Sequence, residues 1–205
     1  RQNLSNAGSA IQTGESWMQS MTDNLSRMQE LAVRANDATM GSADIENLNT
    51  EFQQLQASNS QIIEMANFNG KSLLQGNFSD QDIQAGPGAD QAITINIEDL
   101  NAIVLEDGKT MSDLLDSSQV RVDSDAAVPL IAKAVNHISD RRADMGGQLS
   151  RLNAAQEALV DYQKNLSEGE SQIRDVDMAR ESIRLASAQM QADVSTALQA
   201  QGTSV

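Results

Sequence analysis

The sequence predicts a mainly α-helical protein: an elongated antiparallel helical bundle or coiled-coil rod, with a small β-hairpin region at one end. Long stretches of its 205 residues repeat apolar side chains every three or four positions, as one face of a helix requires. Aromatic residues make up only 2% of the chain, so Ala, Leu, Ile, Val and Met must fill the narrow seams between helices. The two prolines, Pro87 and Pro129, leave long stretches without helix breakers.

The first predicted helix spans residues 4–36 and carries a heptad repeat. Its small and apolar side chains form two registers: Leu4, Ile11, Met18, Leu25 and Ala32, and, three residues on, Ala7, Gly14, Met21, Met28 and Ala35. This is the pattern of a coiled-coil seam. Trp17, Leu31 and Val33 should widen it into a face that packs in a bundle.

A second helix is predicted over residues 43–66, after a break at Gly41. Its apolar positions are Ile45, Leu48, Phe52, Leu55, Ile62 and Ala66. Asn59 takes a position where the repeat calls for an apolar residue. A polar side chain there can set the register of a helix pair at some cost in stability.

Residues 68–125 should form a small β region, because turn signals rich in glycine divide this segment. Ile93, Ile95 and Ile97 alternate with polar residues, which predicts a half-buried strand. Val120 and Val122 alternate more weakly, and a short helical turn is expected near residues 111–115.

Helical periodicity returns over residues 127–168, and Gly169 marks a predicted joint. A last amphipathic segment follows, with apolar positions at Ile173, Val176, Ile183, Met190, Val194 and Leu198. We therefore divide the chain into residues 1–169 and 170–205. The outer helices lie at opposite ends of the sequence and should pair antiparallel.

Composition disfavours several classes of function. The net charge of −15 repels nucleic-acid phosphates and anionic lipid, and no apolar run approaches the roughly 20 residues that span a bilayer. There is no cysteine, and His137 is the single histidine, without a His-Glu-x-x-His motif around it. We expect no catalytic residue, metal site or cofactor, and a protein that is not an enzyme.

Four stretches resemble the bacterial flagellins. They occur in the order that this family shows: NLSRMQELAVRAN at 24–36, NFNGKSLL at 67–74, RRADMG at 141–146 and IRDVDMA at 173–179. Each is weak alone, but together they span most of the chain and are specific.

The resemblance implies a structural subunit that polymerises with copies of itself into the flagellar filament, outside the cell, after secretion through the flagellar export apparatus. Residues 1–169 would form the rod domain, and 170–205 an incomplete core-type helix. By comparison with the family, we expect a fragment without the N-terminal core helix and the extreme C-terminus. An export chaperone would hold the C-terminal helix.

The resemblance also implies an interface formed by Arg27, Leu31 and Glu51. In the family the matching positions form the patch that the Toll-like flagellin receptor of animals recognises. The alternative role for these residues is packing between neighbouring subunits, and both roles are compatible.

Two other functions stay open at this point. The hook–filament junction protein has ends that resemble flagellin, although it usually carries a larger middle region. A signalling coiled coil of chemoreceptor type would explain the long antiparallel helices but not the strand at residues 93–97.

Overall fold

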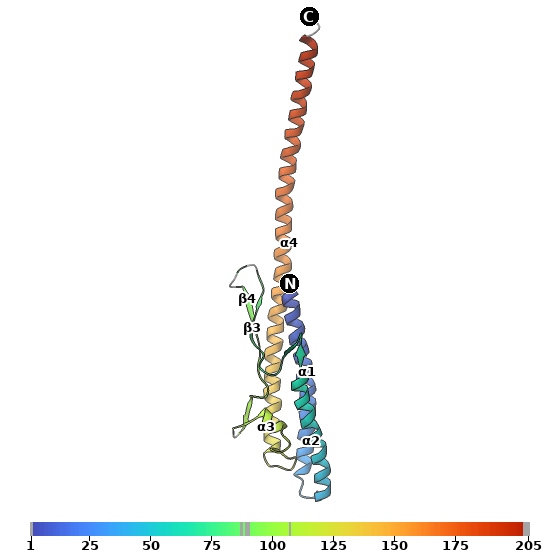
Figure 1. Ribbon diagram of the computed structural model, residues 1–205, viewed down its shortest axis with the longest axis vertical. Helices are drawn as coiled ribbons and strands as arrows, with labels where there is room; N and C mark the ends of the chain where they lie inside the picture. Colours follow the sequence, from blue (N-terminus) through green and yellow to red (C-terminus); the bar gives the residue numbers. More distant parts are fainter. Residues whose placement is uncertain (1, 87, 89–90, 107, 203–205) are drawn as a thin grey trace. The chain divides into compact units, whose positions relative to one another are not determined.

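The computed structural model describes residues 2–86, 88, 91–106 and 108–202, and in α4 it describes side chains as far as Thr196. Its helices and strands, in chain order, are α1 Gln2–Ala35, α2 Ser42–Met65, β1 Asn67–Phe68, β2 Lys71–Ser72, β3 Phe78–Gln84, β4 Ala92–Ile97, β5 Val104–Glu106, β6 Lys109–Thr110, α3 Met111–Leu115 and α4 Ala127–Gly202 (Figure 1). The chain forms two compact units, Arg1–Gln156 and Glu157–Val205. The predicted fold class is confirmed: the first unit is an antiparallel helical bundle with small strand pairs.

Helices α1 and α2 form an antiparallel hairpin whose seam follows the predicted heptads. All ten positions of the two registers in α1 are buried. Leu31 is also fully buried, which confirms that it widens the seam. Val33 is 56% exposed, so its assignment to the packed face was wrong.

The N-terminal part of α4 completes the bundle and runs antiparallel to α1. Contacts between the two helices show the direction, since Gly8 lies near Leu149 whereas Glu15 lies near Arg142. At the middle of this interface a Cβ on Gly14 would lie 2.9 Å from Cε of Met145. Glycine in the heptad thus leaves room for a methionine from the facing helix. The predicted antiparallel pairing is confirmed within the first unit.

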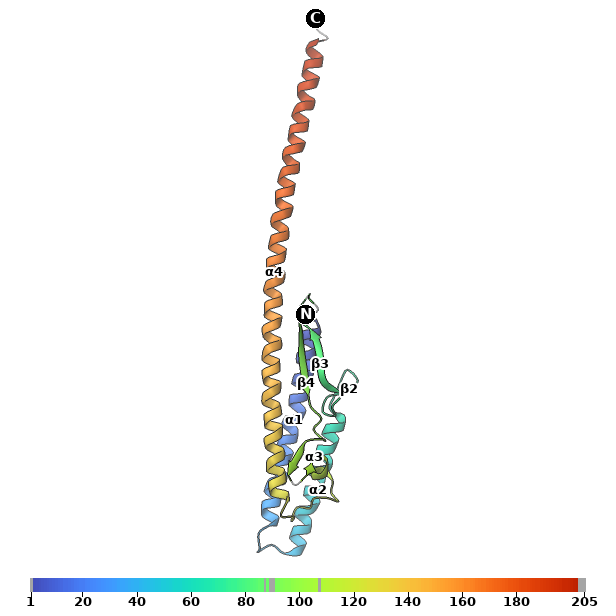
Figure 2. The same ribbon diagram turned by 90° about the vertical axis from the view of Figure 1, so that its left-hand side faces the viewer.

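The β region lies beside these helices as three antiparallel strand pairs, β1–β2, β3–β4 and β5–β6 (Figures 1 and 2). The β3–β4 hairpin lies next to the N-terminal end of α1. Strand β4 is the predicted one, and it turns Ile95 and Ile97 into the core. The side-chain amide of Gln148 on α4 donates to Asn96 O at 3.0 Å and accepts from Asn96 N at 3.1 Å, covering an edge of β4 that β3 leaves open.

Two further expectations for this region had different outcomes. The helical turn is confirmed as α3, Met111–Leu115. The weak strand at Val120 and Val122 is wrong: both residues are buried, but in a segment of turns between α3 and α4. Their alternation reflects burial of two apolar side chains without strand pairing.

Helix α4 runs without interruption through Gly169, so the predicted joint in the helix there was wrong. One glycine in a helix costs only about 1 kcal/mol relative to alanine, which the neighbouring residues can offset. Pro129 lies in the first turn of α4, where its missing N–H has no intrahelical partner to lose. The predicted division into a rod domain, residues 1–169, and a core-type helix, residues 170–205, refers to positions within a filament. It stays a prediction.

Candidate assembly site

The second unit presents a row of apolar side chains on α4. We call Ile173, Val176, Ile183, Met190 and Val194 the terminal stripe. Each member is between 53% and 69% exposed. Val176, Ile183 and Met190 recur every seven residues, and Ile173 and Val194 fill in at steps of three and four, so the stripe follows one side of the helix. Leu198 was predicted to extend it, but its side chain lies outside the described part of the structure.

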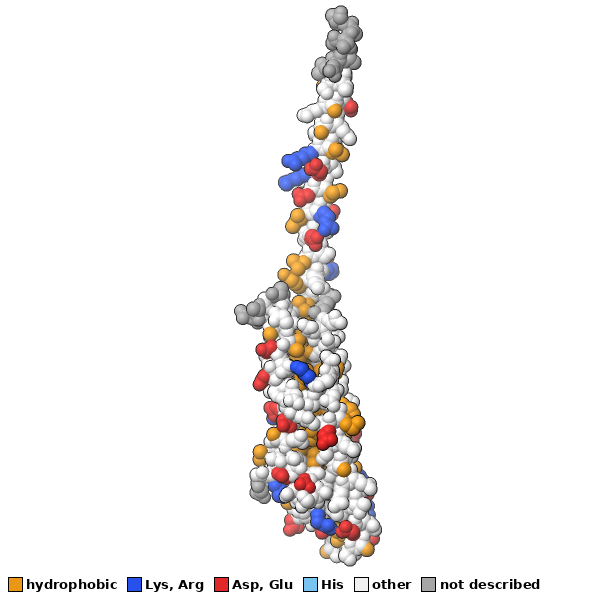
Figure 3. Space-filling view, viewed as in Figure 1, with side chains coloured by type: hydrophobic (Ala, Val, Ile, Leu, Met, Phe, Trp, Pro, Cys, Tyr) orange, Lys and Arg blue, Asp and Glu red, His pale blue; other side chains and the backbone are white. Residues whose placement is uncertain are grey.

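A second pair of exposed apolar residues on α4 was missed from the sequence. Met178 and Leu185, 65% and 61% exposed, are also seven residues apart, and that spacing was the available signal. Figure 3 shows apolar side chains distributed along this part of α4, between acidic and basic ones. The helix therefore has apolar surface on more than one side.

Charged pairs within α4 accompany the terminal stripe. Arg174 bonds to Glu170 at 2.6 Å, and Arg184 lies 3.9 Å from Glu181. Such exposed pairs one turn apart each contribute a few tenths of a kcal/mol to a helix. They favour the helical form of a segment whose apolar residues have little packing of their own.

A second candidate surface lies where α1 faces α2, around Arg27. The guanidinium Nε donates to Glu51 Oε1 at 2.8 Å, and Nη1 donates to Glu30 Oε2 at 3.0 Å. The hydrogen bond to Glu51, followed by that to Glu30, raises the pKa of Arg27. Arg27 and Glu51 thus form a paired polar surface that solvent reaches.

Leu31 does not belong to this surface, which corrects its predicted place in the interface with Arg27 and Glu51. Its exposed fraction is 0%. Leu31 follows Arg27 by one helical turn, but its side chain lies on the face of α1 that packs in the bundle. A buried leucine in the core supports the fold and offers no contact to a partner of the folded chain.

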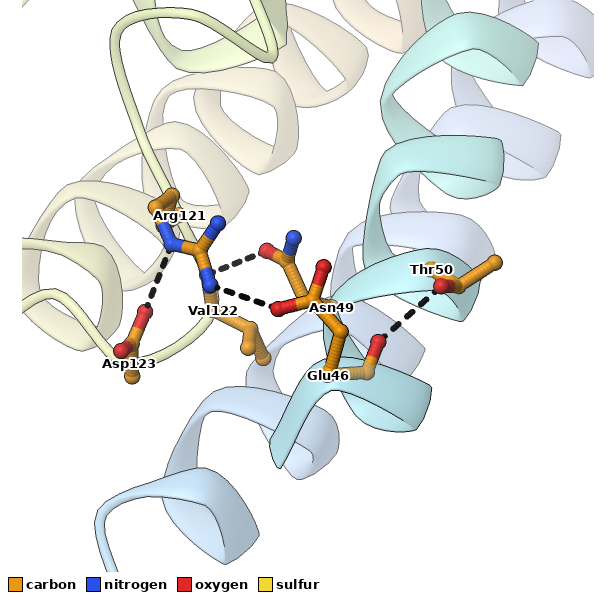
Figure 4. Close-up of polar contacts among 6 residues, drawn as sticks. All are labelled: Glu46, Asn49, Thr50, Arg121, Val122 and Asp123. Atoms are coloured by element: carbon orange, nitrogen blue, oxygen red, sulfur yellow. Dashed lines mark hydrogen bonds and ion pairs between the residues drawn. The ribbon is translucent and has the colours of Figure 1, made fainter. Parts of the chain in front are cut away.

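A polar cluster joins α2 to the segment that leads into α4 (Figure 4). Arg121 donates to Glu46 at 3.1 Å and to Asp123 at 3.2 Å. The hydrogen bond to Glu46, followed by that to Asp123, raises the pKa of Arg121. Beside them, the buried side chain of Asn49 accepts a hydrogen bond from Val122 N at 3.3 Å. The cluster fixes the path of the chain between α3 and α4.

Within the described residues, no three His, Cys, Asp or Glu side chains come together in a group that could hold a metal ion. His137 lies half-buried on α4. Among the helices that the structure describes, none is both long and apolar enough to cross a membrane.

Comparison with known proteins identifies the family. Residues 1–79 match the bacterial flagellin N-terminal helical region, and residues 128–205 match the bacterial flagellin C-terminal helical region. Flagellin FlaB2 of Treponema pallidum is 30% identical over 213 residues, which cover 97% of this chain and 73% of that protein. The chain belongs to the bacterial flagellin family. The family consists of structural proteins of the flagellar filament, and a filament subunit is therefore the general class of this chain.

Other relatives agree with this assignment. A flagellin of Bacillus subtilis is 32% identical, over 84% of this chain and 66% of that protein. The crystal structure of Bacillus cereus flagellin matches with a TM-score of 0.63 at 27% identity, covering 74% of this chain and 85% of that one. A structure from Vibrio parahaemolyticus, described as a flagellar hook-associated protein, has a TM-score of 0.64 at 15% identity, over 79% of this chain and 84% of that one. At that identity the likeness shows the fold alone, and the sequence matches favour flagellin over the junction protein.

Proposed function

We propose that this flagellin polymerises with identical copies into an extracellular filament, and that the terminal stripe of α4 supplies the apolar contact between subunits. The observation that supports the proposal is the exposure of all five stripe residues, each above one half. An isolated helix seldom leaves so regular an apolar row in water, because burying each such side chain contributes about 1.5–3 kcal/mol. Contacts between identical subunits that do not close by rotation give an open helical filament.

The heptad spacing of the terminal stripe defines the kind of contact. Side chains seven residues apart can pack as knobs into the holes of a facing helix. The same stripe of a second copy offers matching spacing and chemistry. Met178 and Leu185 face a different direction, so one helix can contact more than one neighbour, as a polymer requires.

Ile183→Asp should abolish polymerisation. A carboxylate at this position would be buried without a partner in the helix contact, which costs at least several kcal/mol. We would follow assembly by sedimentation and electron microscopy, after extension of the chain with flagellin terminal helices if it does not polymerise alone.

The matched control is Ala188→Asp. Ala188 is exposed on α4 but lies off the stripe, near Arg184 and Glu181 in the helical repeat. Since alanine has the highest helix propensity, the control loses more intrinsic helix stability than Ile183→Asp does. It should still polymerise. Equal assembly of the two variants would contradict the proposed role of the stripe.

Before assembly, the terminal stripe would stay exposed to water unless another protein bound it. We propose that an export chaperone holds α4 through the terminal stripe while the chain awaits secretion through the flagellar export apparatus. The exposed spacing that suits a second copy also suits a helical groove of a chaperone. The chaperone and the polymer would then compete for one surface.

We also propose that the Arg27–Glu51 surface binds the Toll-like flagellin receptor of animals. Its support is the exposed and prearranged guanidinium, with a planar set of donors for a partner's carboxylate or carbonyl. Arg27→Ala should weaken receptor activation by monomer in a reporter-cell assay, whereas Arg34→Ala, also exposed on α1, should not. Wild-type monomer that leaves the reporter silent would refute this role.

A further inference from the structure

The turn between β1 and β2 holds an asparagine in an unusual conformation. Asn67 pairs with Ser72 and Phe68 with Lys71, so Asn69 and Gly70 alone form the loop. Their φ angles are 51° and 79°, which is the left-handed geometry of a tight two-residue hairpin turn. Asn and Gly are the residues that adopt it most readily.

The tip of this hairpin is open to solvent, while its base is fixed. Asn69 and Gly70 are both exposed, and a Cβ built on Gly70 would meet no atom within 4 Å. At the base, Leu73 N donates to Ala66 O at 2.7 Å, and Leu73 and Leu74 are fully buried. The tip can therefore move without disturbing the core.

Asn69 also has a neighbour that no other asparagine of the chain has. It is the only Asn followed by Gly, and the rest precede residues with a side chain. A side chain on the following residue hinders approach of that residue's backbone nitrogen to the asparagine amide. Glycine leaves the approach open and the backbone free to turn.

We propose that Asn69 is the site at which this flagellin deamidates spontaneously through a cyclic imide. The Gly70 backbone nitrogen, after loss of its proton to hydroxide, attacks Cγ of Asn69. The new C–N bond closes the ring, the bond from Cγ to Nδ2 breaks, and ammonia leaves with a proton from solvent. Water then opens the ring at either carbonyl, giving aspartate or isoaspartate.

The products would change the turn in two ways. Both add a negative charge beside Lys71, whose Nζ bonds to Gln81 Oε1 at 3.3 Å on the neighbouring strand β3. Isoaspartate also lengthens the main chain, so a two-residue loop no longer matches the β1–β2 register. The modification would thus record the age of a chain in its charge and in this hairpin.

The experiment incubates the folded chain at mildly alkaline pH and follows every peptide that contains asparagine, above all the one that ends at Lys71, by mass spectrometry with fragmentation. Because an isolated pair of two-residue strands is marginally stable and surface openings cost little, we expect conversion at most about tenfold slower than in urea. Conversion should occur at Asn69 before Asn67 or Asn77 changes.

Two variants test the assignment. Asn69→Gly keeps a residue suited to the turn and removes the amide. The product with one added negative charge, which wild type forms first, should therefore not appear. Gly70→Asp also tolerates the left-handed conformation, but its side chain hinders the nitrogen and should slow conversion severalfold. The proposal is overturned if Asn69 converts only in urea, or if another asparagine of the folded chain converts first.

Discussion

At the scale of single residues, three buried amides on α2 connect the parts of the first unit. Asn59 accepts from Asn24 at 2.9 Å and so joins α2 to α1. Gln56 donates to Leu114 O at 2.7 Å and to Val120 O at 3.1 Å, holding both sides of the segment after α3. Asn49 accepts from Val122 N. Buried polar groups with specific partners favour one arrangement over many similar apolar ones.

Gln56→Met should destabilise the fold by about 2 kcal/mol, because it keeps the side-chain length but leaves two main-chain carbonyls without their buried donor. Gln54→Met is the control, since Gln54 is exposed on the same helix. Urea unfolding followed by circular dichroism would measure both. Equal unfolding midpoints for the two variants would show that the Gln56 bonds contribute nothing net.

Only one of these amides could be predicted. Asn59 stands out because a heptad makes its position apolar, and its burial follows from the local pattern alone. Gln56 and Asn49 bond to main-chain groups between 58 and 73 residues away. No periodicity encodes such partners. Leu31 was correctly assigned to the seam but wrongly to an exposed surface. It lies one helical turn from Arg27, but the helices that pack against α1 decide which of its side chains are buried.

At the scale of elements, α3 is a single turn of helix that depends on its N-terminal cap. Thr110 and Asp113 form a capping box: Asp113 Oδ2 accepts from Thr110 N at 2.7 Å, and Asp113 N donates to Thr110 Oγ1 at 3.3 Å. The bond from the Thr110 backbone, followed by that from its hydroxyl, lowers the pKa of Asp113. The cap fixes the start of α3 and, with it, the buried Met111 and Leu114.

Loss of stability in acid should depend in part on this cap. Because the pKa of Asp113 is lower in the folded than in the unfolded chain, its contribution is complete above the unfolded value of about 3.9 and is lost as pH falls through the folded value. Asp113→Asn should therefore be less stable than wild type at neutral pH and should approach it at acid pH. Urea titrations at several pH values would measure this; a constant difference would contradict the linkage.

Long segments with a regular apolar repeat could be predicted from the sequence, and short strands less well. The helices α1 and α2 begin and end within two residues of their predicted bounds, since many heptad positions agree. Strand β3 escaped prediction because most of its residues are polar, although burial alternates along most of the strand. Without apolar residues at every second position, the sequence carries no period-two signal. Gly169 is the opposite case: an isolated glycine predicts a break, but α4 continues through it because its neighbours keep the helix.

At the scale of the whole molecule, charge opposes the association that the terminal stripe favours. Each chain carries 29 acidic and 14 basic residues, a net charge of −15. Polymerisation brings many such chains together, so their mutual repulsion grows with every added subunit. Apolar contacts must outweigh it. Salt weakens the repulsion because it shortens the Debye length from about 30 Å at 0.01 M to about 8 Å at 0.15 M.

Raising NaCl across that range should therefore lower the protein concentration at which polymer first sediments. Replacing the exposed Glu64, Asp140 and Asp161 with Gln or Asn removes three charges, from −15 to −12, and should lower the threshold at 0.01 M more than at 0.15 M. These three carboxylates make no ion pair within the described residues, so the fold should be unchanged. A threshold that ignores both salt and charge would mean that repulsion does not limit assembly, and that the geometry of the helix contacts alone decides it.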